Sequence, residues 1–166
     1  MGSVVKVLLR FEDGSWILLK KLTVRGFEYF KEGRVVEALP FLILEWSEST
    51  PINYKTCSRL RLEVVKRIQS ELLKEVSWIL NADAKKLHNL LKVIISGHRI
   101  AVEDELASKV LNYIDKALTM IDHKGNIIAW PEPGSVLDQP LDWFLFLRAY
   151  KVAFVEYLAE QNKKGR

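Results

Sequence analysis

The chain has 166 residues, of which 49% are apolar and 28% charged, with 25 Lys and Arg against 21 Asp and Glu. This composition is typical of a globular protein and excludes a disordered chain, a collagen-like repeat and a low-complexity tail. The length suits a single domain, residues 1–166, with a core that needs no disulfides. Charged residues break the apolar runs well short of the roughly 20 residues of a membrane span, so we expect no membrane partner.

Two apolar segments at the start of the chain predict a β-hairpin. Residues 4–11 and 16–22 combine branched side chains with alternating polarity, which is typical of strands. Asp13-Gly14 lies between them and is among the strongest short signals for a hairpin turn.

A short helix is expected over residues 24–31, with Thr23 as its N-cap and Gly33 closing it. Residues 34–47 follow as an apolar run that favours one or two further strands. Pro40 places that part of the chain at a sheet edge or a bend, because proline cannot donate to a strand ladder.

Beyond residue 56 the spacing of apolar residues changes from two to about 3.6, which predicts helices. Strands first and helices after predict an α+β fold, in which an antiparallel β-sheet from the N-terminal half packs against three to four long α-helices. A short strand at residues 127–130 is a candidate to rejoin this sheet. The long helices are expected at residues 57–80, 83–97, 102–122 and 140–161.

Basic and aromatic residues are interleaved in the N-terminal half. Basic groups neutralise phosphates and aromatic faces stack on unpaired bases, so single-stranded nucleic acid is the ligand that needs both. The alternative is that these are solvated strand faces of a mildly basic protein, where edge lysines oppose aggregation. The candidate nucleic-acid-binding residues are Lys6, Arg10, Trp16, Lys20, Lys21, Arg25, Phe27, Tyr29, Phe30, Arg34, Trp46, Arg59 and Arg61.

The sequence carries no catalytic signature. It has no nucleophile elbow, no phosphate-binding loop and no dinucleotide fingerprint. The three histidines lack ligand spacing and Cys57 has no cysteine neighbour, so we expect neither a metal nor another cofactor, and no enzyme. The single cysteine and the lack of a signal in the opening MGSVVKV favour a cytoplasmic protein.

The segment 141–158 is apolar on more than one face of the predicted last helix. Such a helix is either central to a core or shared with another subunit, and both alternatives stay open. The second predicts a homo-oligomer. Its candidate interface residues are Trp143, Phe144, Phe146, Leu147, Tyr150 and Phe154.

The opening VVKVLLRFEDGSWILLKKL, followed by long helices and a further strand, resembles the archaeal ThermoDBP-like single-stranded-DNA-binding proteins. The resemblance covers most of the chain and implies an α+β fold, a cleft rimmed by basic groups, weak sequence preference and oligomers that enclose the strand. The composition, poor in Gln, also suits a thermophile.

We therefore expect a non-enzymatic protein that binds single-stranded DNA or RNA, with DNA preferred, in a basic and aromatic cleft with little sequence specificity. The alternative is a structural or adaptor subunit that docks on another protein through its apolar C-terminal helix.

Overall fold

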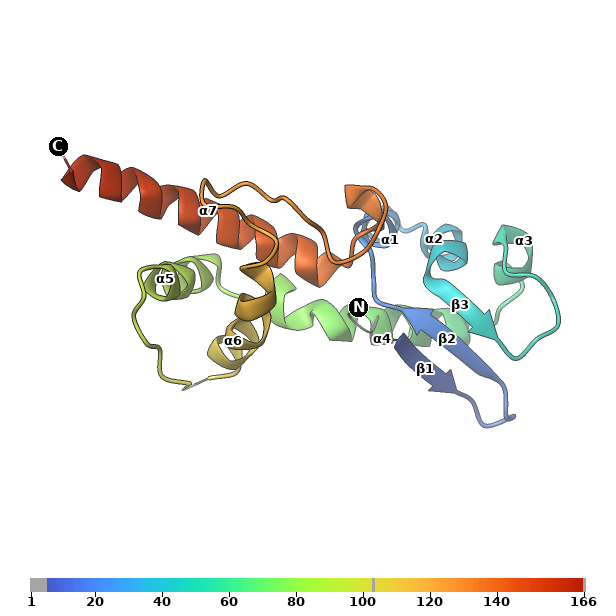
Figure 1. Cartoon of the computed structure of the whole chain (residues 1–166). Helices are drawn as coiled ribbons and strands as arrows, with labels where there is room; N and C mark the ends of the chain where they lie inside the picture. Colours follow the sequence, from blue (N-terminus) through green and yellow to red (C-terminus); the bar gives the residue numbers. More distant parts are fainter. Residues whose placement is uncertain (1–5, 103, 166) are drawn as a thin grey trace. The chain divides into compact units, whose positions relative to one another are not determined.

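The structure of the chain, a computed structural model, describes residues 6–102 and 104–165 (Figure 1). It is a mixed α+β fold with an antiparallel sheet in the N-terminal half, as predicted. Two compact units make up the chain. Unit 1 consists of residues 1–76 and 132–141, and unit 2 of residues 77–131 and 142–166. Compact units of this kind also occur within one domain, so a single domain stays a prediction.

Unit 1 holds a three-stranded antiparallel sheet in the order β1-β2-β3. The hairpin of β1 (Lys6–Arg10) and β2 (Trp16–Lys20) confirms the prediction, although residues 4 and 5 lie outside the described residues. Gly14 has a φ of +84° in the turn, a left-handed conformation that side chains disfavour. The third strand, β3 (Ile43–Trp46), pairs with β2 through a register shift between Leu18 and Leu19.

The alternation of the hairpin gives the sheet two different faces. Val7 pairs with Leu19, and Leu9 with Ile17, so these side chains share the inner face, where Leu9, Ile17 and Leu19 are buried. The other residues of β1 and β2 project from the opposite face, which we call the outer face. Its cross-strand pairs are Lys6 with Lys20, Leu8 with Leu18 and Arg10 with Trp16.

The helix α1 (Val24–Lys31) begins where predicted, because the Thr23 hydroxyl accepts a hydrogen bond from the Gly26 N–H at 3.1 Å. The prediction for residues 34–47 is wrong over its first part. This segment forms α2 (Val35–Leu42), and the strand starts only at Ile43.

The reason for α2 is burial on one helical side. Ala38, Leu39 and Leu42 are fully buried, and this packing outweighs the preference of its branched residues for strands. Pro40 lies inside α2, where its missing N–H removes one intrahelical bond near the end of a short helix.

The helix predicted at residues 57–80 begins later than expected, and a separate helical turn precedes it. A single turn, α3 (Tyr54–Cys57), is capped by Asn53, whose side chain accepts from the Thr56 N–H at 3.0 Å. The long α4 (Leu62–Leu80) begins after a break at residues 58–61. Its apolar positions Val65, Ile68, Leu72 and Val76 are buried at the predicted helical spacing.

The segment 132–141 belongs to unit 1 although it comes late in the chain. It contains the short 3-10 helix η1 (Val136–Asp138) and is bonded to the chain around Thr23. The Val24 N–H donates to the Gln139 carbonyl at 3.0 Å, and the Leu141 N–H donates to the Leu22 carbonyl at 2.8 Å.

Unit 2 is helical, with α5 (Ala84–Ile95), α6 (Glu105–Ala117) and most of α7 (Leu141–Lys164). α6 starts later than predicted because the Asp104 carboxylate accepts from the Ala107 N–H at 2.9 Å and caps the helix there. Residues 127–130 form no strand. One isolated bridge between Ile121 and Ile127 stands in its place, so this segment does not rejoin the sheet.

Within the part of the chain that the structure describes, no helix is both long enough and apolar enough to cross a membrane.

Candidate nucleic-acid interface

The outer face of the sheet carries cations and apolar groups in three rows. Directly opposite residues of an antiparallel pair have Cβ atoms about 4.5–5.5 Å apart. Lys6 therefore lies beside Lys20, and Arg10 beside Trp16, with the Leu8–Leu18 pair between these two rows. Leu8 is 45% exposed, so the apolar row is open to solvent.

The cations of the outer face have no acidic partners in the described structure. Neither Lys6, Arg10 nor Lys20 has a carboxylate within 4 Å among residues 6–102 and 104–165. Glu45 of β3 is the cross-strand partner of Leu18 in β2, so its carboxylate lies on the same face. The face thus presents three cations, one carboxylate, one indole and exposed aliphatic groups.

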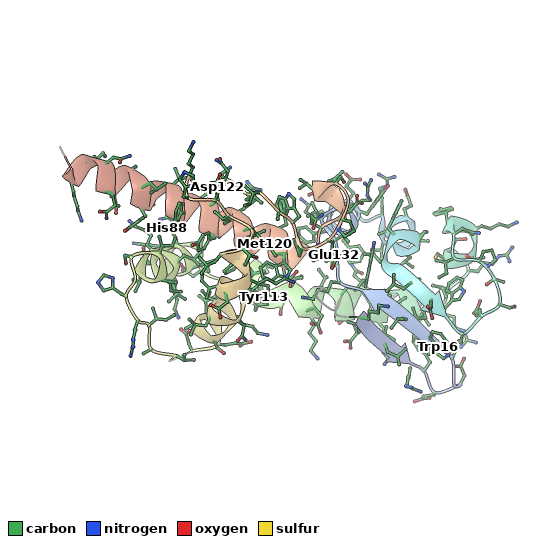
Figure 2. The ribbon with its side chains drawn as sticks, viewed as in Figure 1. Trp16, His88, Tyr113, Met120, Asp122 and Glu132 are labelled. Atoms are coloured by element: carbon green, nitrogen blue, oxygen red, sulfur yellow. The ribbon has the colours of Figure 1, made fainter. Side chains whose placement is uncertain are left out.

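An open pocket of about 640 Å³ adjoins this face at the end of the hairpin. Its walls are the turn region 11–17, residues 46–48 after β3, and residues 59–67 around the start of α4. Trp16 belongs both to the outer face and to the pocket lining, and Figure 2 shows it at the turn end of β2.

Three arginines line the pocket. The Arg67 guanidinium is held in place, because its Nη1 donates to the Arg10 carbonyl at 2.8 Å and it lies 4.8 Å from the centre of the Phe11 ring. The Arg61 charge lowers the pKa of the Asp13 carboxyl, and the Arg59 side chain has no partner among the described residues.

Four carboxylates line the same pocket: Glu12, Asp13, Glu48 and Glu63. Asp13 accepts from the Ser15 N–H and hydroxyl, and these bonds lower the pKa of its carboxyl below 3.8, with Arg61 adding a smaller contribution. Glu48 accepts from the Thr50 hydroxyl at 3.3 Å. The pocket therefore combines donors and acceptors and carries no excess of positive charge.

Two predicted stacking residues are buried, and the prediction that they face a ligand is wrong. Phe30 is 8% exposed within unit 1, so its ring faces are covered by the protein. Trp46 is also 8% exposed, and its indole N–H donates to the Thr50 carbonyl at 2.8 Å. Both are core residues in this structure.

The remaining aromatic residues of α1 already have partners. Tyr29 stacks on Phe41 with ring centres 6.1 Å apart, and the Arg34 guanidinium lies 4.8 Å from the Tyr29 ring. Lys31 lies 5.2 Å from the ring of Phe27. On the ring faces that these groups cover, a base could stack only by displacing them.

The cations around α1 are also paired. Arg25 lies over Phe41 and contacts Asp138 at 3.4 Å, while Arg34 forms ion pairs with Glu32 and Glu37. Lys21, half-buried after β2, has an interaction partner as well. The structure thus separates the predicted set into open groups on the outer face and pocket, and engaged groups around α1.

Sequence reasoning missed Arg67, the Leu8–Leu18 row and the four carboxylates of the pocket. Glu71 follows Arg67 by one helical turn, a spacing typical of a solvent-facing ion pair, so the sequence pattern favours no site role for Arg67. The alternation of residues 6–10 did signal the Leu8–Leu18 row, because it placed Leu8 between Lys6 and Arg10 on one face. Nothing in the sequence signalled that residues 59–67 lie near the hairpin turn.

Five of the six residues predicted as an oligomer interface, all but Phe144, lie in or against the core of unit 2. Trp143, Phe146, Leu147 and Tyr150 are each at most 9% exposed, so they cannot form a surface, and this part of the prediction is wrong. Phe144 stacks on Trp130, and Phe154 on Tyr150. The homo-oligomer itself stays a prediction.

The aromatic core of unit 2 explains these contacts. Tyr113 packs against Trp143 with ring centres 4.5 Å apart, and its hydroxyl donates to the Asp142 carboxylate at 2.5 Å. Trp78 lies 5.0 Å from Tyr113. The first half of α7 is therefore apolar on several sides because it packs in this core, whereas Val152 and Val155 further along α7 are exposed.

Among the residues that the structure describes, no three His, Cys, Asp or Glu side chains gather closely enough to hold a metal ion.

No protein-family model matches the sequence, no curated protein is significantly similar to it, and no solved structure significantly resembles its fold. The likeness to the ThermoDBP-like proteins therefore stays a prediction.

Proposed function

We propose that this protein binds single-stranded nucleic acid, with DNA as the preferred ligand, on the outer face of the sheet of unit 1. The observation that carries the proposal is the Lys6–Lys20 pair. Like charges placed directly opposite on a sheet repel each other and destabilise it. A phosphate between the two ammonium groups removes that repulsion, so an anionic ligand supplies the missing partner.

The neighbouring rows suit the rest of a nucleotide chain. Arg10 offers a further cation for the backbone, and the half-buried Trp16 beside it offers an indole face to an unpaired base. The Leu8–Leu18 row gives apolar contact to sugars and bases. Contacts of these kinds to phosphates and ring faces carry little sequence information.

A single strand fits better than a duplex. Readout of a duplex requires an element that enters a groove, such as a helix or a two-stranded ribbon with exposed polar side chains. The outer face instead combines cations with an indole and leucines, which contact bases only where these are unpaired. We propose that this binding involves no catalysis and that the protein acts in the cytoplasm, where its buried free Cys57 stays reduced.

The test is fluorescence anisotropy with a labelled dT12 and with a hairpin duplex of equal nucleotide number. We expect binding to dT12 that weakens with salt, with a slope of about −2 in log K against log salt if the three cations each neutralise one phosphate. No binding at low salt, or equal affinity for the duplex, would contradict the proposal.

A second candidate is an adaptor role through unit 2. The observation in its favour is the exposure of two apolar side chains on α7, Val152 (61%) and Val155 (47%). Docking would use these two valines and not the six aromatic and leucine positions. Stable co-purification with one protein partner, lost in a Val152→Glu variant, favours this candidate over nucleic acid.

A further inference from the structure

We propose that the pocket at the turn end of the hairpin binds a guanine base of the bound strand. This inference rests on the proposed function and adds one position of base preference to a surface that otherwise lacks it. The pocket is lined by residues of the turn, of the segment after β3 and of the start of α4, and Trp16 connects it to the outer face.

The charges in the pocket favour a base over a phosphate. Three arginines face four carboxylates, whereas the outer face has three cations and one carboxylate. A phosphate in the pocket would lie among carboxylates that repel it. A neutral ring with donors and acceptors can contact both kinds of side chain, so the backbone belongs on the outer face and a base in the pocket.

The side-chain types select among the bases. An arginine pairs with the O6 and N7 acceptors of guanine through two hydrogen bonds, and a carboxylate accepts from N–H donors. Guanine has adjacent donors at N1 and N2, which match the two oxygens of one carboxylate. Adenine is bound in two-bonded fashion by Asn or Gln, and no such amide is present among the described residues that line the pocket. Thymine has no amino group, so it cannot offer two adjacent N–H donors to one carboxylate.

Two lining residues are free to make these contacts. The side chains of Arg59 and Glu63 have no hydrogen-bond or ion-pair partner among the described residues, and both residues are exposed at the pocket. Arg67, Asp13 and Glu48 are engaged with other groups. We therefore assign the O6 and N7 contacts to Arg59 and the N1 and N2 contacts to Glu63, with Trp16 covering one ring face.

The test measures anisotropy of labelled 12-mers of dT that carry one central dG, dA, dC, deoxyinosine or 7-deaza-dG. We expect the dG strand to bind about fivefold or more tightly than dT12, as one good two-bonded contact provides. Inosine lacks the N2 amino group and 7-deazaguanine lacks N7, so each of these strands should lose much of the gain.

The variants assign the contacts. Glu63→Gln should bind dG and inosine strands equally, and Arg59→Ala should bind dG and 7-deaza-dG strands equally, each measured relative to the same variant's affinity for dT12. Glu75→Gln is the matched control, an exposed carboxylate of α4 outside the pocket, and it should keep both preferences. Circular dichroism of each variant checks the fold.

The outcomes separate the two proposals. Tight binding of dT12 with no gain for dG, or a larger gain for dA or dC, overturns the guanine pocket and leaves the proposed function standing. No binding to any of the strands overturns both. A guanine preference that survives in the Glu63→Gln and Arg59→Ala variants overturns the assignment to this pocket.

Discussion

Lys6 and Lys20 are cross-strand partners on the outer face of the sheet, and neither has a carboxylate within 4 Å among the described residues. Folding alone gains nothing from this arrangement, because two ammonium groups on directly opposite residues repel each other. A sheet optimised for stability would place an acidic residue at one of the two positions. The pair therefore connects a local cost in stability with a proposed gain in binding.

Replacing either lysine should separate these two effects. In Lys20→Gln the repulsion disappears, so we expect the free energy of unfolding to rise by a few tenths of a kcal/mol. One phosphate contact is lost at the same time, so dT12 binding should weaken and its salt slope should fall by about 0.7. Urea denaturation and anisotropy at several salt concentrations measure the two quantities.

The control for this experiment is Lys85→Gln, an exposed lysine of α5. Both its stability and its dT12 binding should match those of the parent protein. A Lys20→Gln protein that is less stable than the parent, with unchanged binding, would show that Lys20 has a structural role and is no phosphate contact.

The two tryptophans of the sheet should respond differently to truncation. Trp16→Ala should weaken dT12 binding by about 1–3 kcal/mol through loss of one stacked base and leave the protein folded, and Trp16→Phe should recover part of the binding. Trp46→Ala should destabilise the protein by about 3–5 kcal/mol, because Trp46 is buried in unit 1. Anisotropy and thermal melts measure both. If Trp16→Ala melts as readily as Trp46→Ala, then Trp16 is a core residue.

Within α7 the buried and exposed apolar residues should also behave differently. Phe146 is fully buried in the aromatic core of unit 2, so Phe146→Ala should cost about 3–5 kcal/mol of stability. Val152 is 61% exposed, and Val152→Ser should change stability by no more than about 0.5 kcal/mol. Chemical denaturation of the two variants is the measurement. Similar effects of both changes would mean that α7 does not pack through the Phe146 side.

Cys57 gives the protein an alkaline sensitivity. Burial raises the pKa of its thiol from 9.0 to about 11, so between these values the folded chain keeps a proton that the unfolded chain has lost. Stability is therefore fully present below pH 9 and falls as the pH rises toward 11. Urea denaturation at pH 8, 9.5 and 10.5 should show this loss in the parent protein and a smaller one in Cys57→Ala.

A reagent for thiols offers a second readout of the same feature. In the folded protein at pH 8, Cys57 is buried and protonated, so its reaction with a disulfide reagent should follow the unfolding rate. Rapid labelling under native conditions would contradict the burial of Cys57.

The elements that local sequence signals determine were predicted well. The hairpin follows from the Asp13-Gly14 turn and from alternation, and α1 follows from the capping hydroxyl of Thr23. α5 begins after Asp83, whose carboxylate accepts from the Lys86 N–H at 2.8 Å. In each case the residues that decide the structure lie within a few positions of one another.

The predictions fail where contacts between distant parts of the chain determine the local structure. Residues 35–42 have the composition of a strand, but burial of Leu39 and Leu42 against the rest of unit 1 selects a helix. The side of α7 that is covered depends on aromatic residues of other helices, such as Tyr113 and Trp78. Composition alone left a core helix and a subunit interface equally open.

The candidate site shows the same division. The outer-face positions Lys6, Arg10, Trp16 and Lys20 follow from strand alternation within one hairpin. The pocket requires that residues 59–67 lie near the turn, and no local pattern reports that proximity. The sequence pattern therefore identifies the cations but not the carboxylates that line the pocket beside some of them.

Unit 1 is built from two stretches of chain, and this has a consequence for biosynthesis. The backbone groups of Leu22 and Val24 find their partners on Leu141 and Gln139, which the ribosome adds on the order of several seconds after the hairpin has emerged. Until then the hairpin can form, but the backbone groups of Leu22 and Val24 have no hydrogen-bond partners from residues 132–141. Translation that stops at residue 131 would release a chain in which these backbone groups have lost their acceptor and donor, a form that quality-control proteases recognise as unfolded.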